Sequence, residues 1–289
     1  MPYKDTKIYF DGSHYIGIPH EEHPERRRKN VATNDDKKQA FEAAYEENKT
    51  KKKAEKTESI VKSIKEHFND EQQAREYVEQ NTERKRKNLA AKRTRLYRKV
   101  NMQKWDYFAT FTYDDKKHDE ITFRRSLSNC LKHLSSRKGW KYVGVWERGN
   151  KTERLHFHAL LYIPDGAMVG ELIEKKDYSF ETHRRQTTYQ NTFFNERYGR
   201  TDFKEIVPYE ISETVAYMVK YMEKTGERIV YSKNLPQYFV SDVLDYEVLC
   251  RCGIEDRKLI LADNFTCITD GEIIGEVSPE VIAKMPKSN

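Results

Sequence analysis

A strand-like run from 154 to 162 places His156 and His158 two residues apart. Alternate residues of a strand leave the same face, so both imidazoles lie on one side of a sheet. Glu147 ends the preceding strand-like run, and a turn near 150–152 brings it opposite or beside His156. Two imidazoles and a carboxylate can hold a divalent metal; imidazoles suit Mn²⁺, Co²⁺, Ni²⁺ or Zn²⁺ better than Mg²⁺ alone. A His-x-His pair by itself is more often a polar surface feature than a metal site. With Glu147 on the partner strand, the two interpretations are about equally favoured.

A helical run from 212 to 224 carries two tyrosines and two lysines, each pair at one-turn spacing. Tyr217 and Tyr221 share one face, and Lys220 and Lys224 form a second pair on an adjoining stripe. A phenol has a pKa of about 10, so a tyrosine nucleophile needs help to ionise. A neighbouring ammonium lowers that pKa and stabilises negative charge on a phosphorus transition state. Alone, the run favours an amphipathic packing helix; beside a metal, it favours attack on a phosphodiester.

Three motifs together resemble the HUH endonucleases, the initiators of rolling-circle replication. Residues 108–112, Phe-Ala-Thr-Phe-Thr, are similar to the first motif of that family, and residues 156–158 match its His-hydrophobe-His motif. Residues 217–224 are similar to the third motif of the two-tyrosine class found in phage initiators. The histidines precede the tyrosines, as in initiators, whereas relaxases have the reverse order. The resemblance covers about 89–235, and the ordered trio is more specific than any single motif.

The resemblance implies metal-dependent nicking of a single-stranded or extruded origin. A tyrosine attacks the scissile phosphodiester, becomes linked to the 5′ phosphate and frees a 3′ hydroxyl that primes synthesis. The second tyrosine cuts the regenerated origin after one round. The implied cofactor is a divalent metal, Mg²⁺ or Mn²⁺. The implied site contains metal ligands His156, His158 and Glu147, nucleophiles Tyr217 and Tyr221, and supporting cations Lys220 and Lys224.

Basic residues are concentrated just before the first strand of the motif region. The 289 residues include 53 Lys and Arg against 47 Asp and Glu, a net charge of +6. The segment 83–99 holds nine basic residues against the single acid Glu83, so it can account for the whole surplus. Such a cluster is typical of a protein that binds a phosphate backbone; the alternative is a solvated helix face. The predicted DNA contacts are Arg84, Lys85, Arg86, Lys87, Lys92, Arg93, Arg95, Arg98 and Lys99.

The middle of the chain alternates strand and helix signals. From 105 to 232 the order is strand, helix, strand, strand, insertion, strand, helix and strand. This order predicts an α+β fold, an antiparallel sheet with helices on one face. The family resemblance implies an HUH-type sheet of about five strands. Within the insertion after Pro164 we expect a helix near 169–175 and a polar loop near 178–195.

Composition divides the chain into three parts. Residues 35–100 contain no Gly or Pro and many good helix formers, which predicts one or two long helices, frayed around 48–56. After 235 we expect a small helical piece and a hairpin near 269–271. The predicted domains are a charged helical arm at 1–100, an HUH endonuclease domain at 101–235 and a small extension at 236–289.

Other features limit the class of protein. No apolar stretch approaches the roughly 20 residues of a membrane span, and the N-terminus lacks a signal-peptide core, so we expect the cytoplasm of a bacterial host cell. There is no G-x-x-x-x-G-K-[ST] loop, so we expect a host helicase as partner, with a host polymerase to extend the 3′ end. Cys250, Cys252 and Cys267 could supply zinc ligands, but buried structural thiols are the favoured interpretation.

Two other classes of function stay open from the sequence. A non-catalytic nucleic-acid-binding protein would use the basic helices and leave the histidines incidental. An HUH-type transposase or relaxase would use the same chemistry for transposition or plasmid transfer, although the motif order disfavours transfer and such transposases carry one tyrosine. A metal-dependent hydrolase that uses water gives the tyrosines no role.

Overall fold

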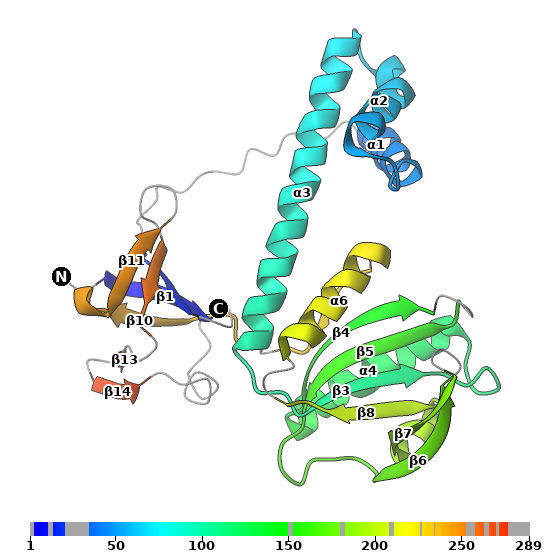
Figure 1. Cartoon of the computed structure of the whole chain (residues 1–289), viewed down its shortest axis with the longest axis vertical. Coiled ribbons are helices and arrows are strands. Elements are labelled where there is room, and N and C mark those ends of the chain that lie inside the picture. Colours follow the sequence, from blue (N-terminus) through cyan, green and yellow to red (C-terminus); the bar gives the residue numbers. More distant parts are fainter. Residues whose placement is uncertain are drawn as a thin grey trace. The chain divides into compact units, whose positions relative to one another are not determined.

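The computed structural model describes residues 3–10, 14–20, 35–149, 153–179, 183–207, 211–225, 227–233, 235–252, 258–262, 266–269 and 272–276. The chain forms two compact units, Glu21–Thr94 and the combination of Met1–His20 with Arg95–Asn289. Helix α3 (Glu71–Asn101) has residues in both units (Figure 1). None of the described helices is both long enough and apolar enough to cross a membrane.

Over its described residues, 35–94, the unit Glu21–Thr94 is helical and contains two α-helices and the first part of α3, where one or two helices were expected. The chain leaves helical structure after Glu47, near the predicted fray. Its apolar residues are too sparse for one helix to be stable alone, so the helices fold back and bury them together. The core contains Phe41, Ile60, Val61, Ile64 and Val78. The helical elements are α1 (Asp35–Glu47), α2 (Lys53–Ile64), a 3₁₀ turn η1 (Lys65–His67) and the first part of α3.

The second unit contains the predicted central sheet. Five antiparallel strands pair in the order β8-β3-β5-β4-β9, which confirms the α+β class and the strand number. The long β4–β5 hairpin lies at its centre and β8 and β9 are the edges. The strands are β3 (Tyr107–Thr112), β4 (Lys141–Arg148), β5 (Leu155–Tyr162), β8 (Thr201–Glu205) and β9 (Val230–Tyr231).

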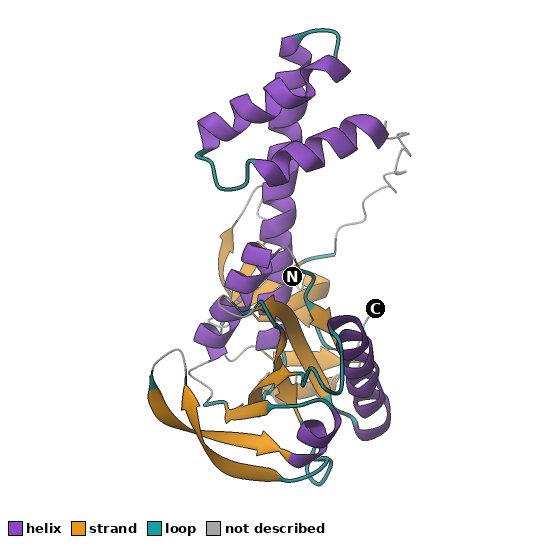
Figure 2. Cartoon of the chain, turned by 90° about the vertical axis from the view of Figure 1, so that its right-hand side faces the viewer, coloured by secondary structure: helices purple, strands orange, loops and turns teal. Residues whose placement is uncertain are grey.

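Helices cover both faces of this sheet, not the one face expected (Figure 2). Helix α4 (Glu120–Lys138) packs on the face that carries Trp146 and Phe157. Helix α6 (Ile211–Thr225) and the end of α3 pack on the face that carries Val145. The reason is visible in β4, whose six central residues are all buried; a strand that is apolar on both sides needs cover on both sides.

The segment between β5 and β8 forms a hairpin where a helix and a loop were expected. Strands β6 (Leu172–Ser179) and β7 (Arg184–Asn191) pair along all eight positions and are followed by helix α5 (Thr192–Arg197). Both strands are rich in polar residues, so they lack the alternating apolar pattern by which a strand is recognised. Their pairing, with β-branched Thr187 and Thr188 in β7, outweighs the helical propensity of the Glu-Lys-Lys run at 174–176.

The two ends of the chain share a separate five-stranded sheet of order β10-β1-β2-β12-β11. Strands from the predicted arm and from the predicted extension therefore pair with each other, which the sequence did not indicate, while the three-part domain division itself stays a prediction. The helical piece expected after 235 is one 3₁₀ turn, η3 (Asp245–Glu247). The strands are β1 (Tyr3–Phe10), β2 (Tyr15–Ile18), β10 (Phe239–Val243), β11 (Val248–Cys252) and β12 (Lys258–Leu261), with a further hairpin of β13 (Thr266–Thr269) and β14 (Glu272–Glu276).

Gly144 gives the first test of this packing. A Cβ at Gly144 would overlap the ring of Phe157 in the core under α4, so we expect Gly144→Ala to lower the free energy of unfolding by about 1–3 kcal/mol. Urea denaturation followed by tryptophan fluorescence measures it, because Trp146 lies 4.5 Å from Phe157 between ring centroids. In a Phe157→Leu background, Gly144→Ala should lower the free energy of unfolding by less than it does in the parent, because the ring that the Cβ overlaps is gone. Equal stability of Gly144→Ala and the parent would contradict this packing.

Candidate functional site: a histidine pair facing a tyrosine helix

The register of the central sheet brings the predicted histidines and glutamate together. Glu147 is directly opposite His156 in the β4–β5 ladder, as the hairpin prediction required. On the other side of β5, strand β3 places Thr112 opposite His156 and Thr110 opposite His158. All five side chains belong to the sheet face that α6 covers, because they alternate with residues of the core beneath α4.

Two threonine hydroxyls hold the two imidazole rings. Thr112 Oγ1 lies 2.8 Å from His156 Nδ1, and Thr110 Oγ1 lies 3.0 Å from His158 Nδ1. A hydroxyl can donate or accept, so it satisfies Nδ1 in either tautomer of the ring. Each Nδ1 therefore has a partner, and each Nε2 is the nitrogen left for another one. These threonines lie inside the motif 108–112, yet we predicted no role for them; their spacing of two, matching that of the histidines, was the available signal.

Glu147 contacts His158 at the ring nitrogen that the threonine does not use. Its Oε2 accepts a hydrogen bond of 2.8 Å from Nε2 of His158, and both side chains are buried. Burial lowers the pKa of His156 to about 4, and the nearby His158 and Arg200 charges act in the same direction, against the opposite effect of Glu147. His156 is consequently a neutral imidazole at neutral pH, which is the form that binds metals.

The donor set is chemically suited to a divalent ion. It combines two imidazoles with one carboxylate, and outer hydrogen bonds orient both rings, as is usual for metal-binding histidines. Among the described residues, no group of three His, Cys, Asp or Glu side chains is already arranged to coordinate a metal ion. Instead His158 Nε2 and Glu147 Oε2 contact each other, so metal binding would replace that hydrogen bond.

Helix α6 brings Tyr217 beside His158. Val215 and Met218 of this helix are buried against the sheet, which turns the helix so that Tyr217 lies at the edge of the contact with 36% of its surface exposed. The Tyr217 ring is 5.6 Å from the His158 ring and 5.8 Å from the Phe108 ring between centroids, edge-on to both. Phe108 in turn stacks on His158.

The remaining predicted residues of this helix are placed less fully. Lys220 is exposed on α6. Tyr221 and Lys224 fall within the bounds of α6, but their side chains lie outside the described residues. The structure thus brings together His156, His158, Glu147 and Tyr217, and the roles of all seven residues stay predictions.

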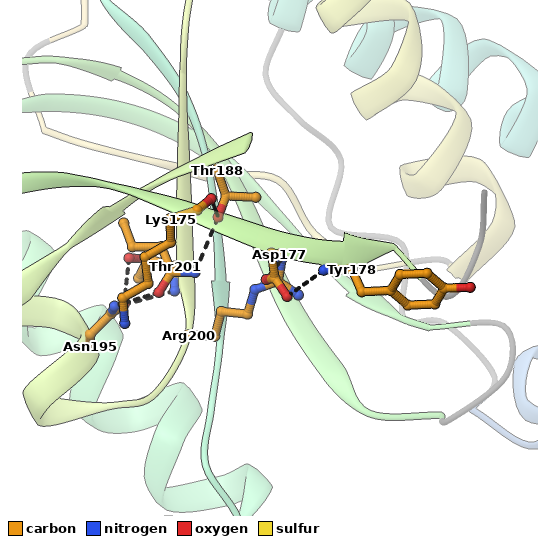
Figure 3. A network of polar contacts seen from close by, with 8 residues as sticks. Lys175, Asp177, Tyr178, Thr188, Asn195, Arg200 and Thr201 are labelled. Carbon is orange, nitrogen blue, oxygen red and sulfur yellow. Dashed lines mark hydrogen bonds and ion pairs between the residues drawn. The ribbon is translucent and has the colours of Figure 1, made fainter. Parts of the chain in front are cut away.

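At the edge of the sheet, strand β8 and the residue before it add polar side chains to the histidine face. The backbone N–H of Thr112 donates to the carbonyl of Arg200, and Asp202 is opposite Thr110, so both new side chains share the histidine face. Arg200 pairs with Asp177 of β6 at 2.5 Å between Nη2 and Oδ2 (Figure 3). Burial raises the pKa of the Asp202 carboxyl above its usual range. Arg200 and Asp202 were not predicted, because only strand pairing brings them to the histidine face.

Several of the predicted DNA-binding residues on α3 have partners within the protein. Lys85 pairs with Glu42 of α1, and Arg86 and Lys87 both pair with Glu83 one turn away. Lys85 is half-buried by its contacts, whereas Arg86 and Lys87 remain exposed. Exposed pairs at this spacing contribute little to stability and leave the cations accessible.

At the other end of α3, two cations contact aromatic rings. The Arg98 guanidinium lies 3.8 Å from the centre of the Tyr9 ring and the Lys99 ammonium 5.0 Å from that of Tyr231. Burial lowers the pKa of Lys99. Both contacts hold the helix to strands, so these two residues are less available to DNA. The arm residues that are exposed along α3 are Arg84, Arg86, Lys87, Lys92, Arg93 and Arg95.

The cysteine expectation is wrong for the one C-terminal cysteine that can be assessed. Cys250 is exposed on β11 rather than buried. The side chains of Cys252 and Cys267 lie outside the described residues. Cys250 is in an edge strand of the sheet formed by the two chain ends, where alternate side chains face solvent.

Comparison with known proteins points to DNA replication. Residues 106–226 match the family model described as Replication-associated protein ORF2/G2P. That segment contains the paired threonines, both histidines, Glu147 and helix α6. No curated protein and no solved structure matches the chain. The match is consistent with a replication protein of the rolling-circle type.

Removing one threonine hydroxyl directly tests the hydrogen bonds between the threonines and the histidines. Thr110→Val keeps the side-chain shape but leaves Nδ1 of the buried His158 without its partner, so we expect a loss of about 1–3 kcal/mol in the free energy of unfolding. Urea denaturation in EDTA measures this without metal. Thr187→Val, at an exposed position of β7, is the matched control and should change little. Equal effects of the two variants would contradict the assigned hydrogen bond.

Proposed function

We propose that this protein initiates rolling-circle replication as an HUH-type nickase and strand transferase of the two-tyrosine class. The observation that carries the proposal is the position of the Tyr217 ring, 5.6 Å from that of His158 on the face where Glu147 and His156 meet. A phenol beside a metal-ligand set is the arrangement that transesterification of a phosphodiester requires. The matched replication family supports the same conclusion.

The residues that would hold the metal are His156, His158 and Glu147. When bound, a divalent ion polarises the scissile phosphate and neutralises charge that builds on its oxygens. Thr110 and Thr112 keep both rings oriented for it through Nδ1. Mn²⁺ or Mg²⁺ is the proposed ion.

Tyr217 is the proposed nucleophile for strand cleavage. Its phenol oxygen forms a bond to phosphorus while the bond from phosphorus to the 3′ oxygen breaks. The phenol loses its proton and the departing 3′ oxygen gains one, so the products are a 5′-phosphotyrosine and a free 3′ hydroxyl. Lys220, on the same helix, is the proposed cation that favours the phenolate.

A second nucleophile would complete the replication cycle. Tyr221 follows Tyr217 by four residues in α6 and has Lys224 three residues further on. We propose that it cuts the regenerated origin, after which the 3′ hydroxyl attacks the first phosphotyrosine and closes the circle. The exposed cations of α3 would bind the DNA backbone, and a host helicase and polymerase would unwind and extend it.

A covalent adduct is the decisive observation. Incubated with Mn²⁺ and a randomised single-stranded DNA pool, the full chain should form a protease-sensitive DNA adduct that is seen on a denaturing protein gel. Tyr217→Phe and Tyr221→Phe should each abolish one of the two strand transfers, and the double variant should form no adduct. An adduct in the double variant would refute the nucleophile assignment. No adduct with any metal, together with tight DNA binding, would instead support a non-catalytic binding protein.

Metal dependence follows from the ligand assignment. EDTA and His156→Ala should each abolish adduct formation, and excess Mn²⁺ should restore only the EDTA-treated parent. Thr112→Val should raise the Mn²⁺ concentration needed for half-maximal adduct formation by about 10- to 100-fold, because it frees the His156 ring. His133→Ala, on the exposed surface of α4, is the control and should behave as the parent. Full activity of His156→Ala would rule out the proposed metal site.

A further inference from the structure

The β6–β7 hairpin has two chemically different faces. Along its inner face, Thr188 and Gln190 are buried, and Asp177 pairs with Arg200. The outer face carries Tyr178 and Tyr189, which keep 44% and 47% of their surfaces exposed. Two exposed rings on one face of a polar ribbon need an explanation, because most other aromatic rings described in this unit are buried or half-buried, with Tyr217 and Tyr246 as the exceptions.

Hydrogen bonds fix the base of the hairpin to the catalytic sheet (Figure 3). The backbone N–H of Asn191 donates to Thr201 Oγ1 at 2.9 Å, and the Thr201 hydroxyl donates to Asn195 Oδ1 at 2.7 Å. Asn191 and Thr201 are completely or almost completely buried. An isolated two-stranded ribbon is marginal in water, so this network and the Arg200–Asp177 pair are what give the ribbon a defined position beside β8.

Positive charge accompanies the tyrosines on the outer face. Arg185 is directly opposite Tyr178, and Lys176 lies on the same face two residues before it. Within the part of the chain that the structure describes, neither cation has an ion pair, and the single acid on this face, Glu174, is opposite Tyr189. Tyr178 is four residues along β6 from that pair, so the two rings are separated by about 13 Å. Each ring can therefore take a different base.

We propose that the outer face of the β6–β7 hairpin is a binding platform for single-stranded DNA. Aromatic side chains stack on bases of any sequence, and nearby cations follow the phosphates; together they define a single-strand binding surface. The hairpin is anchored through Arg200, whose carbonyl accepts from the N–H of Thr112, the residue that holds His156, so the platform has a fixed position in the unit that contains the proposed nicking site. The proposal rests on the proposed nickase only for the identity of the nucleic acid.

Equilibrium binding tests the platform without any cleavage. Full-length protein in EDTA is titrated against fluorescein-labelled oligo(dT), with anisotropy as the readout. Tyr178→Ala and Tyr189→Ala should each weaken binding by about fivefold or more, with little change in salt dependence. Tyr178→Phe and Tyr189→Phe should bind as the parent, because they keep the ring. Lys176→Gln with Arg185→Gln should instead lower the salt slope, by about 0.7 for each phosphate that the protein no longer neutralises.

Matched controls separate this surface from a general effect. Tyr246→Ala removes a more exposed tyrosine from η3, and Lys132→Gln removes an exposed cation from α4; both should bind oligo(dT) as the parent does. Binding of Tyr178→Ala and Tyr189→Ala equal to that of Tyr246→Ala would overturn the proposal and leave a protein partner as the occupant. An equal loss for a blunt duplex would overturn the single-strand assignment. A parent protein that forms no adduct would refute the nickase while leaving this binding result intact.

Discussion

Glu147 and His156 occupy opposed positions in the β4–β5 ladder, and the whole candidate site depends on that register. Side chains alternate between faces along a strand, so a slip of one residue would turn both histidines toward α4. The slip is prevented by burial, because Trp146 and Phe157 on one face and Val145 on the other pack into two different cores. The same apolar alternation that stabilises the hairpin therefore also aligns its polar residues.

Covering both faces of the sheet has a direct consequence for the chemistry. A sheet with helices on one face would leave the histidines open to water, whereas α6 buries Val215 and Met218 over their strands and carries Tyr217 with it. Tyr217, the proposed nucleophile, is thus positioned by ordinary apolar packing of its close neighbours on the helix. Site residues held by rigid elements in this way keep their geometry without support from flexible loops.

Both imidazole Nδ1 atoms and the Glu147 carboxylate have protein partners, so this arrangement is stable without a metal. Thr110 and Thr112 satisfy the imidazole Nδ1 atoms, and Glu147 accepts from His158. Unpaired, these groups would each destabilise the fold. In His158, Thr110 holds Nδ1 and Glu147 contacts Nε2. A ligand can therefore replace Glu147 at Nε2 while Thr110 keeps the ring oriented.

The local pattern of the sequence determined the antiparallel strands, the helix with Tyr217 and the hairpin that joins Glu147 to the histidines, because these depend on alternation and spacing within short segments. It could not show that β1 pairs with β10, that a polar hairpin replaces the expected helix after Val169, or that Arg200 reaches the histidine face. The β1–β10 pairing and the Arg200 contact join segments distant in the chain, and the hairpin, although local, has a polar sequence and is held by contacts with β8 and Arg200. Their energy is in hydrogen bonds and burial that no single segment contains, so only the tertiary structure decided them.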